Sequence, residues 1–175
     1  MKNQHLNNPK HSEVCWVNDQ EWASTTLPMS LLNWLRDSQA ALDVRAGCDS
    51  GHCGSCAVLL DGTAVKACSV WAPEAKGQRL YSLQGLSLLK EPVVQAVVRA
   101  EQELQPFQCG YCKPAFMLAA VELLRLQAQP TVAQIKQQFS GLLCRCTGYQ
   151  SIVAMVLAAA NYLDCDVGHL PKGEN

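Results

Sequence analysis

Several common signatures are missing from this 175-residue sequence, and each absence narrows what the chain can be. No uninterrupted apolar run reaches the roughly 18 residues that a membrane-spanning helix needs. The polar first 13 residues contain neither the apolar core of a secretory signal nor a twin-arginine pair. We therefore expect a cytoplasmic protein without a membrane span, although export together with a signal-bearing partner stays open.

Charge of one sign and catalytic motifs are also scarce. Fourteen basic and fifteen acidic side chains leave a formal net charge of −1, and no basic stripe is visible. Such a balance gives no long-range attraction to nucleic acid or to an anionic membrane, so neither is expected as a partner. The sequence also contains no HExxH zinc motif, no phosphate-binding GxGxxG motif and no convincing pair of nucleophile and base. The chain alone is therefore not expected to activate a substrate.

Cysteine, in contrast, is abundant, and eight of the ten cysteines fall into two sets of four. The first set is Cys48-x4-Cys53-x2-Cys56 with Cys68, and the second is Cys109-x2-Cys112 with Cys144-x-Cys146. The spacing of the first set is that of plant-type [2Fe–2S] loops. A disulfide framework normally goes with secretion, so the missing export signals favour clustered thiolates that bind metal. Two such sites indicate a relay for single electrons, whose catalytic partner is another polypeptide.

The loop that carries the first set is rich in glycine, with Gly47, Gly51 and Gly54 among the ligands. A backbone that wraps a cluster needs positive φ values and N–H groups directed at sulfur, and glycine allows both. Four thiolates could also hold structural zinc. Zinc, however, gives no reason for a nine-residue glycine-rich loop with three ligands, so the sequence favours iron and sulfide at this site.

Each cysteine pair of the second set lies just before a predicted helix. Pro114 follows the first pair and suits a first helical turn, and the helix after the second pair is predicted to begin near Tyr149. The free N–H groups and positive dipole ends of two helix N-termini would suit an anionic cluster. The spacing of this set, taken alone, leaves iron–sulfur and zinc undecided.

Residues 13–84 are predicted to form a small β-rich unit around the first set. Residues 14–17 are predicted as a strand that ends in an Asn-Asp turn, and residues 30–37 have the apolar spacing of a helix. The strongest local signal is Asp-Gly between the apolar runs 57–60 and 63–70, which predicts a two-residue β-hairpin. This hairpin would return Cys68 to the loop of the other three ligands.

From about residue 85 the pattern changes to that of helices, and residues 85–165 are predicted to form a four-helix unit. The predicted helices begin at Pro92, cover 115–126, run from a capping box at Thr131 to Phe139, and cover 152–163. Tails are expected at 1–12 and 166–175. The two domains are expected to meet near residues 84–91, with Gly85 as the joint.

Three segments make the chain recognisable: RAGCDSGHCGSC at 45–56, QCGYC at 108–112 and LCRCTGY at 143–149. They resemble the signatures of the small iron–sulfur subunit of the molybdenum hydroxylases, the xanthine dehydrogenase and aldehyde oxidoreductase family. The resemblance extends in order from about residue 14 to residue 163. It implies an α+β protein in which a β-grasp, plant-type ferredoxin-like domain is followed by a four-helix-bundle [2Fe–2S] domain.

The same resemblance implies a division of labour among subunits. A large subunit with a molybdenum–pterin cofactor would hydroxylate an aldehyde or an N-heterocycle. This chain would carry the electrons singly through two [2Fe–2S] clusters to an FAD subunit or to another acceptor such as a cytochrome. The helical-domain cluster would lie nearer the pterin, and Gln108 and Cys146 would approach that cofactor.

The chain would thus be the iron–sulfur subunit of an oxidoreductase, with no catalytic residue of its own toward substrate. A free-standing two-cluster electron carrier or redox sensor is the alternative function, and a structural zinc protein is the third.

A few residues depart from the family pattern or lie outside the two sets. Lys113 and Ala115 stand where the family commonly has Thr and Gly, and Leu142 stands where it has Asn. These three positions border the helical-domain cluster, so its potential and its pterin contacts are not fixed by the resemblance. Cys15 is expected as a buried hydrophobe in a strand and Cys165 as one just past the last helix.

Overall fold

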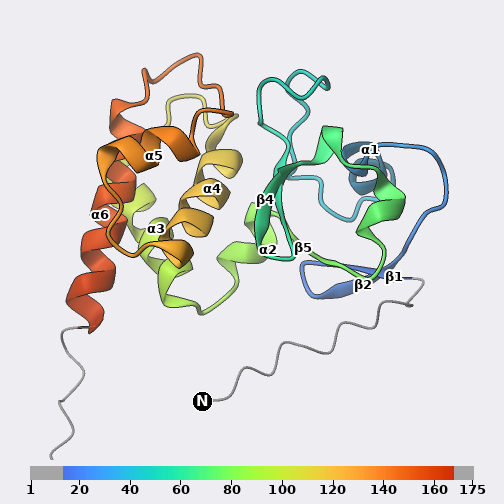
Figure 1. The fold of residues 1–175 in the computed structure, drawn as a ribbon, viewed down its shortest axis with the longest axis horizontal. Helices are drawn as coiled ribbons and strands as arrows, with labels where there is room; N and C mark the ends of the chain where they lie inside the picture. The colour runs from blue at the N-terminus through green and yellow to red at the C-terminus, as the bar shows by residue number, and fades with distance from the viewer. Residues whose placement is uncertain (1–13, 168–175) are drawn as a thin grey trace, which may run out of the picture.

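The computed structural model describes residues 14–167, which form one five-stranded sheet with helices on both of its faces (Figure 1). The strands are β1 (Val14–Val17), β2 (Gln20–Ala23), β3 (Ala57–Leu60), β4 (Thr63–Lys66) and β5 (Arg79–Tyr81). The helices are α1 (Leu31–Asp37), α2 (Leu83–Ser87), α3 (Pro92–Leu104), α4 (Lys113–Leu126), α5 (Val132–Gln138) and α6 (Gln150–Val167), with 3₁₀ turns η1 (Ala67–Ser69) and η2 (Ala72–Ala75). None of the helices in the described range combines the length and apolarity that a membrane span requires. The predicted α+β class is confirmed.

The sheet has the strand order β2-β1-β5-β3-β4, with β1 and β5 parallel and the other neighbours antiparallel. The predicted hairpin is confirmed, because Leu60 pairs with Thr63 and leaves a two-residue turn. Both turn residues, Asp61 and Gly62, have positive φ values of 46° and 88°, as a type I′ turn requires. The sequence did not reveal β2 or β5, and β5 is the three-residue strand at the centre of the sheet.

The prediction that the second hairpin strand continues to residue 70 is wrong. Strand β4 ends at Lys66, and the chain turns into η1, which contains Cys68. The amide of Ala67 donates to the carbonyl oxygen of Cys56 at 3.2 Å, so the turn begins directly beside the end of the glycine-rich loop. The break in the strand is what brings the fourth cysteine back to the other three.

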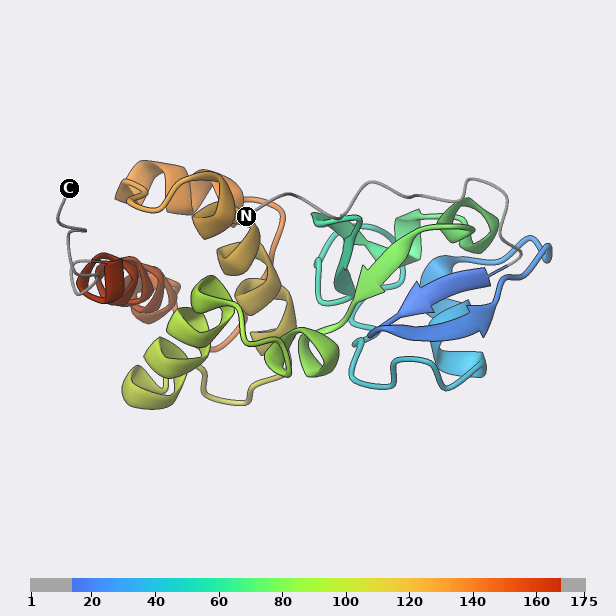
Figure 2. The same cartoon turned by 90° about the horizontal axis from the view of Figure 1, so that it is seen from below.

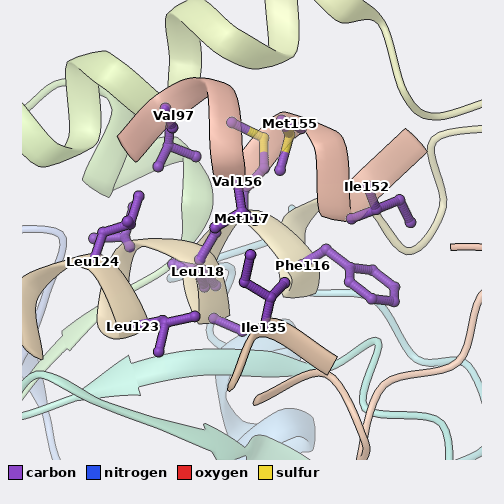
Figure 3. Packing of buried hydrophobic residues seen from close by; sticks show 14 of the residues in the cluster. Val97, Phe116, Met117, Leu118, Leu123, Leu124, Ile135, Ile152, Met155 and Val156 are labelled. Carbon is purple, nitrogen blue, oxygen red and sulfur yellow. The ribbon is translucent and has the colours of Figure 1, made fainter. Parts of the chain in front are cut away.

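Helices α3 to α6 pack around an apolar centre in which Phe116, Ile135, Ile152 and Met155 are almost fully buried (Figure 3). The predicted helices are confirmed, and so is the capping box that opens α5 at Thr131. Helix α6 is longer than predicted at both ends. Cys165 was expected after the last helix, but it lies within α6.

The sheet lies between α1 and α4 (Figure 2). Its face toward α4 belongs to the apolar core of the helical half, so both halves of the chain contribute to that core. Along β3, Val58 faces the apolar cluster that includes α1, whereas Ala57 and Leu59 belong to the cluster of the helical half. This alternation is the period-two pattern of a strand that is covered on both faces.

The segment between the halves is held firmly rather than left as a joint. Gly85 lies inside α2, where an added Cβ would stand 2.0 Å from Oδ1 of Asn18. The side chain of Asn18 also donates to Oγ of Ser82 at 3.0 Å and accepts from the amide of Ser82 at 2.9 Å. Glycine is therefore needed at position 85 for close packing.

Candidate iron–sulfur sites

The first cysteine set surrounds the loop that leads into β3. Cys56 directly precedes the strand and is only 2% exposed, while Cys48 is exposed. The amide of Cys53 donates to Sγ of Cys48 at 3.3 Å, and the amide of Ser55 donates to Sγ of Cys53 at 3.4 Å. Backbone N–H groups thus point at the sulfur atoms, as they do in loops that stabilise an anionic cluster.

The three glycines of this loop meet two different requirements. Gly51 and Gly54 have φ values of 77° and 72°, in the left-handed region that favours glycine. Gly47 is not in that region, but a Cβ on it would lie 2.7 Å from Sγ of Cys53. The backbone therefore approaches the thiolates more closely than any side chain would allow, which fits a group held by a tight loop.

The thiols of the first set differ in acidity. Hydrogen bonds from the amide of Cys53 and from Ser50 lower the pKa of Cys48 to about 6. Burial, with a contribution from the neighbouring Cys68 thiol, raises the pKa of Cys56 to about 12. Metal binding displaces the proton of a thiol, so iron bound here would release a proton from Cys56 at neutral pH.

The second set lies at one end of the helical half, at the top of Figure 1. Cys112 immediately precedes α4, as predicted, whereas Cys146 is separated from α6 by three residues. Sγ of Cys146 lies 3.7 Å from Sγ of Cys109. Burial, followed by the neighbouring Cys144, raises the pKa of Cys112 to about 12.

Thr147 supplies two further contacts to this set. Its amide donates to Sγ of Cys144 at 3.4 Å, and its Oγ1 lies 3.1 Å from the same sulfur. Burial alone would raise the pKa of Cys144, but hydrogen bonds from Thr147, together with those from the backbone of Cys146 and the side chain of Cys112, lower that pKa. These contacts were not predicted from the sequence, although Thr147 directly follows the Cys-x-Cys pair there.

The eight cysteines come together in pairs. No three His, Cys, Asp or Glu side chains between residues 14 and 167 are grouped closely enough to hold a single metal ion. The four thiol pairs in contact are Cys48 with Cys53, Cys56 with Cys68, Cys109 with Cys146, and Cys112 with Cys144. A [2Fe–2S] cluster takes two thiolates on each of its two irons, so two pairs per site fit that group.

The two cysteine-bearing regions touch each other through their backbones. The amide of Leu143, which precedes Cys144, donates to the carbonyl oxygen of Cys53 at 2.9 Å. A Cβ on Gly54 would lie 2.7 Å from the carbonyl oxygen of Gly141 and 2.5 Å from Cδ2 of Leu142. The loops of the two sites are therefore in direct contact.

Two tyrosines form hydrogen bonds at this junction. Tyr111, between the first two cysteines of the second set, donates its hydroxyl to the carbonyl oxygen of Ala46 at 2.8 Å. Tyr149 accepts from the amide of Cys144 at 3.0 Å and donates to the carbonyl oxygen of Leu142 at 3.3 Å. No feature of the sequence pattern distinguishes these hydroxyl groups from those of ordinary core tyrosines.

The positions that depart from the family pattern have clear surroundings. Nζ of Lys113 forms an ion pair with Oε1 of Glu101 on α3 at 2.8 Å. Leu142 is buried against the glycine-rich loop, and Ala115 is buried in the helical core. Cys15 is 1% exposed, as predicted, and burial raises its pKa to about 12.

One face beside the second set is open and partly apolar. Gln108, Cys109, Arg145 and Cys146 are exposed, and so are the side chains of Tyr111 (46%) and Leu143 (55%). A shallow hollow of about 330 Å³ adjoins Leu143 and is also lined by Phe139, Leu142, Tyr149 and Val153. A surface of this kind suits contact with another protein.

Comparison with known proteins places both halves of the chain. Residues 3–105 match the model of a 2Fe-2S iron-sulfur cluster binding domain, and residues 83–157 match that of a [2Fe-2S] binding domain. The xanthine dehydrogenase iron-sulfur-binding subunit of Escherichia coli O157:H7 is 36% identical over 84% of this chain and 95% of its own length. The nicotine 6-hydroxylase small subunit of Paenarthrobacter nicotinovorans is 36% identical over 74% of this chain and 77% of its own.

Solved structures agree with these matches. A chain of quinoline 2-oxidoreductase from Pseudomonas putida 86 superposes with a TM-score of 0.77 at 28% identity, over 87% of this chain and 94% of that one. The aldehyde oxidoreductase from Desulfovibrio desulfuricans ATCC 27774 gives a TM-score of 0.74 at 30% identity, over 87% of this chain but 17% of that longer one.

Proposed function

Because this chain belongs to the small iron–sulfur subunits of the molybdenum hydroxylases, we propose that it transfers single electrons from the molybdopterin centre of a large partner subunit to a flavin subunit or another acceptor. The partner would oxidise an aldehyde or an N-heterocycle. The single observation that carries the proposal is the hydrogen bond between Leu143 and Cys53, which joins the backbones of two four-cysteine sites.

The finer architecture follows the same assignment. Residues 13–84 form a β-grasp, plant-type ferredoxin-like domain, and residues 85–165 form a four-helix-bundle domain. The mixed sheet with α1 on one face supports the first part, and the shared core of α3 to α6 supports the second.

Each site holds one [2Fe–2S] cluster, which supplies one-electron chemistry when it is bound. The ligands of the plant-type site are Cys48, Cys53, Cys56 and Cys68, and those of the helical site are Cys109, Cys112, Cys144 and Cys146. The four thiol pairs, the amides directed at sulfur and the close approach of Gly47 support this assignment. Eight free thiols require a reducing compartment during cluster insertion, which supports assembly in the cytoplasm.

The chain's own atoms provide a short route between the sites. From Cys144 the covalent backbone leads to the amide of Leu143, across a 2.9 Å hydrogen bond to the carbonyl oxygen of Cys53, and on to the thiolate of that residue. Tyr149 fixes the beginning of this route because its hydroxyl bonds to the amide of Cys144.

The helical site faces the large subunit. Exposed Cys146 and Gln108 lie on the open face beside Leu143 and Tyr111, where apolar side chains would be covered by a partner. Gln108 and Cys146 would be the residues nearest the pterin of the partner subunit, and the helical site would then be the proximal one-electron site and the plant-type site the distal one.

Two serine variants test this order in the purified complex. Cys112→Ser should lose the helical cluster, because serine is a poorer iron ligand, and it should leave the plant-type cluster oxidised when substrate is added anaerobically. Cys53→Ser should allow reduction of the helical cluster while turnover with an external acceptor collapses. The measurement is electron paramagnetic resonance of each cluster after anaerobic addition of xanthine, nicotine, quinoline or an aldehyde.

Two outcomes would contradict the proposal. Zinc in place of iron, in protein purified anaerobically from its native source, would refute the relay. Normal reduction of the remaining cluster in the Cys112→Ser variant would show that the order of the two sites is reversed. Iron-containing protein that never co-purifies with a molybdenum-containing subunit would instead indicate a free-standing carrier.

A further inference from the structure

Lys66 is a cation at the junction of the two cysteine-bearing regions, and it is not one of the proposed cluster ligands. It is the last residue of β4, two positions before Cys68. Its Nζ donates to the carbonyl oxygen of Gly51, in the glycine-rich loop, at 2.8 Å. A Cβ on Gly141 would lie 3.4 Å from the same Nζ, so the ammonium group also borders the loop that leads to Cys144.

The charge of Lys66 is not neutralised locally. The ion pairs between side chains of residues 14–167 involve other cations, and none places a carboxylate on Lys66. The side chain is partly buried, so water screens its field less than it screens that of a surface lysine.

Two cations adjoin ligands of the helical site in the sequence. Lys113 follows Cys112 directly and is paired with Glu101 at 2.8 Å. The side chain of Glu101 is only 14% exposed, so this pair is well formed. Arg145 lies between Cys144 and Cys146, but it is exposed, so water screens its charge. Of these three cations, Lys66 alone is both partly buried and without a carboxylate partner among the described residues.

From this asymmetry we infer that Lys66 is a positioning residue that stabilises the reduced form of the plant-type cluster and so directs the electron toward it. The inference rests on the proposed function. A reduced [2Fe–2S] cluster is one charge more negative than the oxidised one, so a nearby fixed cation favours reduction. The electron gained by the plant-type cluster is the one lost by the helical cluster, and no other reactant is needed.

The test is a potentiometric titration of both clusters in the full chain within its complex. A unit charge about 12 Å away, acting at an effective dielectric constant of about 20, changes a one-electron equilibrium by about tenfold. At the wild-type midpoint potential, Lys66→Met should therefore lower the ratio of reduced to oxidised plant-type cluster about tenfold, which equals 59 mV for one electron. The helical cluster should shift less, because Lys66 hydrogen-bonds to the other loop.

Matched variants separate charge from structure. Lys66→Arg keeps the cation and should titrate close to wild type. Lys90→Met removes one lysine charge at an exposed position between α2 and α3, and it should move neither potential. If Lys66→Met does not retain the plant-type cluster, Lys66→Gln, which can still donate to Gly51, should show the same shift.

The possible failures are distinguishable. Absence of iron and sulfide in the wild-type chain would refute the proposed function itself. With both clusters present, an unchanged plant-type potential in Lys66→Met, or an equal shift in Lys90→Met, would overturn the inference alone. Loss of the plant-type cluster in both the Met and Gln variants would also overturn it, because Lys66 would then only hold the loop.

Discussion

Replacing Gly54 by alanine tests how the two cysteine-bearing loops are held together. Gly54 has a φ of 72°, and its added Cβ would stand 2.7 Å from the carbonyl oxygen of Gly141. A backbone atom cannot rotate out of the way as a side chain can. The loops must therefore separate, and the hydrogen bond between Leu143 and Cys53 should lengthen or break.

The expected cost of Gly54→Ala has three parts, and a second glycine separates the first of them from the other two. A side chain in the left-handed region costs about 1–2 kcal/mol, and the lost hydrogen bond adds about 0.5–1.5 kcal/mol. Gly62, in the hairpin turn, has a φ of 88° but no atom within 4 Å of its added Cβ. The variant Gly62→Ala should therefore carry only the backbone part, whereas Gly54→Ala should carry that part, the hydrogen bond and the clash.

The assays are thermal bleaching of the clusters and stopped-flow reduction of the complex. The lost hydrogen bond, at about 1 kcal/mol, corresponds to about 2–4 °C in the midpoint of a chain this size. The clash adds to this, so Gly54→Ala should bleach at least that far below Gly62→Ala. It should also slow transfer between the clusters, because its route through Leu143 is lengthened. Equal midpoints and equal transfer rates in the two variants would refute the reasoning.

Three further predictions concern the same region. Tyr111→Phe removes the hydroxyl that binds Ala46 and should destabilise the chain by about 0.5–1.5 kcal/mol without loss of iron, measured by thermal bleaching and iron analysis. The raised pKa of Cys112 keeps its thiol protonated once the cluster has gone, so cluster loss takes up protons and should quicken in chelator as the pH falls from about 8 to about 6. Glu101→Gln leaves Lys113 unpaired beside Cys112 and should raise the potential of the helical cluster, measured by redox titration.

One result would contradict each of these three predictions. Iron loss in Tyr111→Phe would mean that the hydroxyl is needed for ligation rather than for joining the loops. A pH-independent rate of cluster loss would mean that proton uptake does not accompany it. An unchanged or lower helical-cluster potential in Glu101→Gln would mean that the charge of Lys113 does not reach the cluster.

The parts of the fold that the sequence predicted are those in which local chemistry decides the structure. Asp61 and Gly62 specify a tight turn by their φ values, and Thr131 with Gln134 specifies a helix start by reciprocal hydrogen bonds. Strand β5 escaped prediction because three residues carry too little periodicity, and its place at the centre of the sheet depends on distant partners.

The candidate sites show the same division. Cysteine spacing and glycine content predicted which residues gather, because a loop of fixed length limits where ligands can lie. The contacts between the sites could not be predicted, since Leu143 meets Cys53 through backbone atoms that every residue possesses. Gly85 was interpreted as a joint because glycine permits either movement or close approach, and only the position of Asn18 decides between them.

The packing of β3 has a consequence for folding and biogenesis. Since Ala57 and Leu59 belong to the core of the helical half, that half cannot complete its apolar interior without β3. The plant-type half could not be excised as an independent ferredoxin without leaving these side chains in water. A nascent chain therefore cannot cover this face of β3 before α4 has been synthesised.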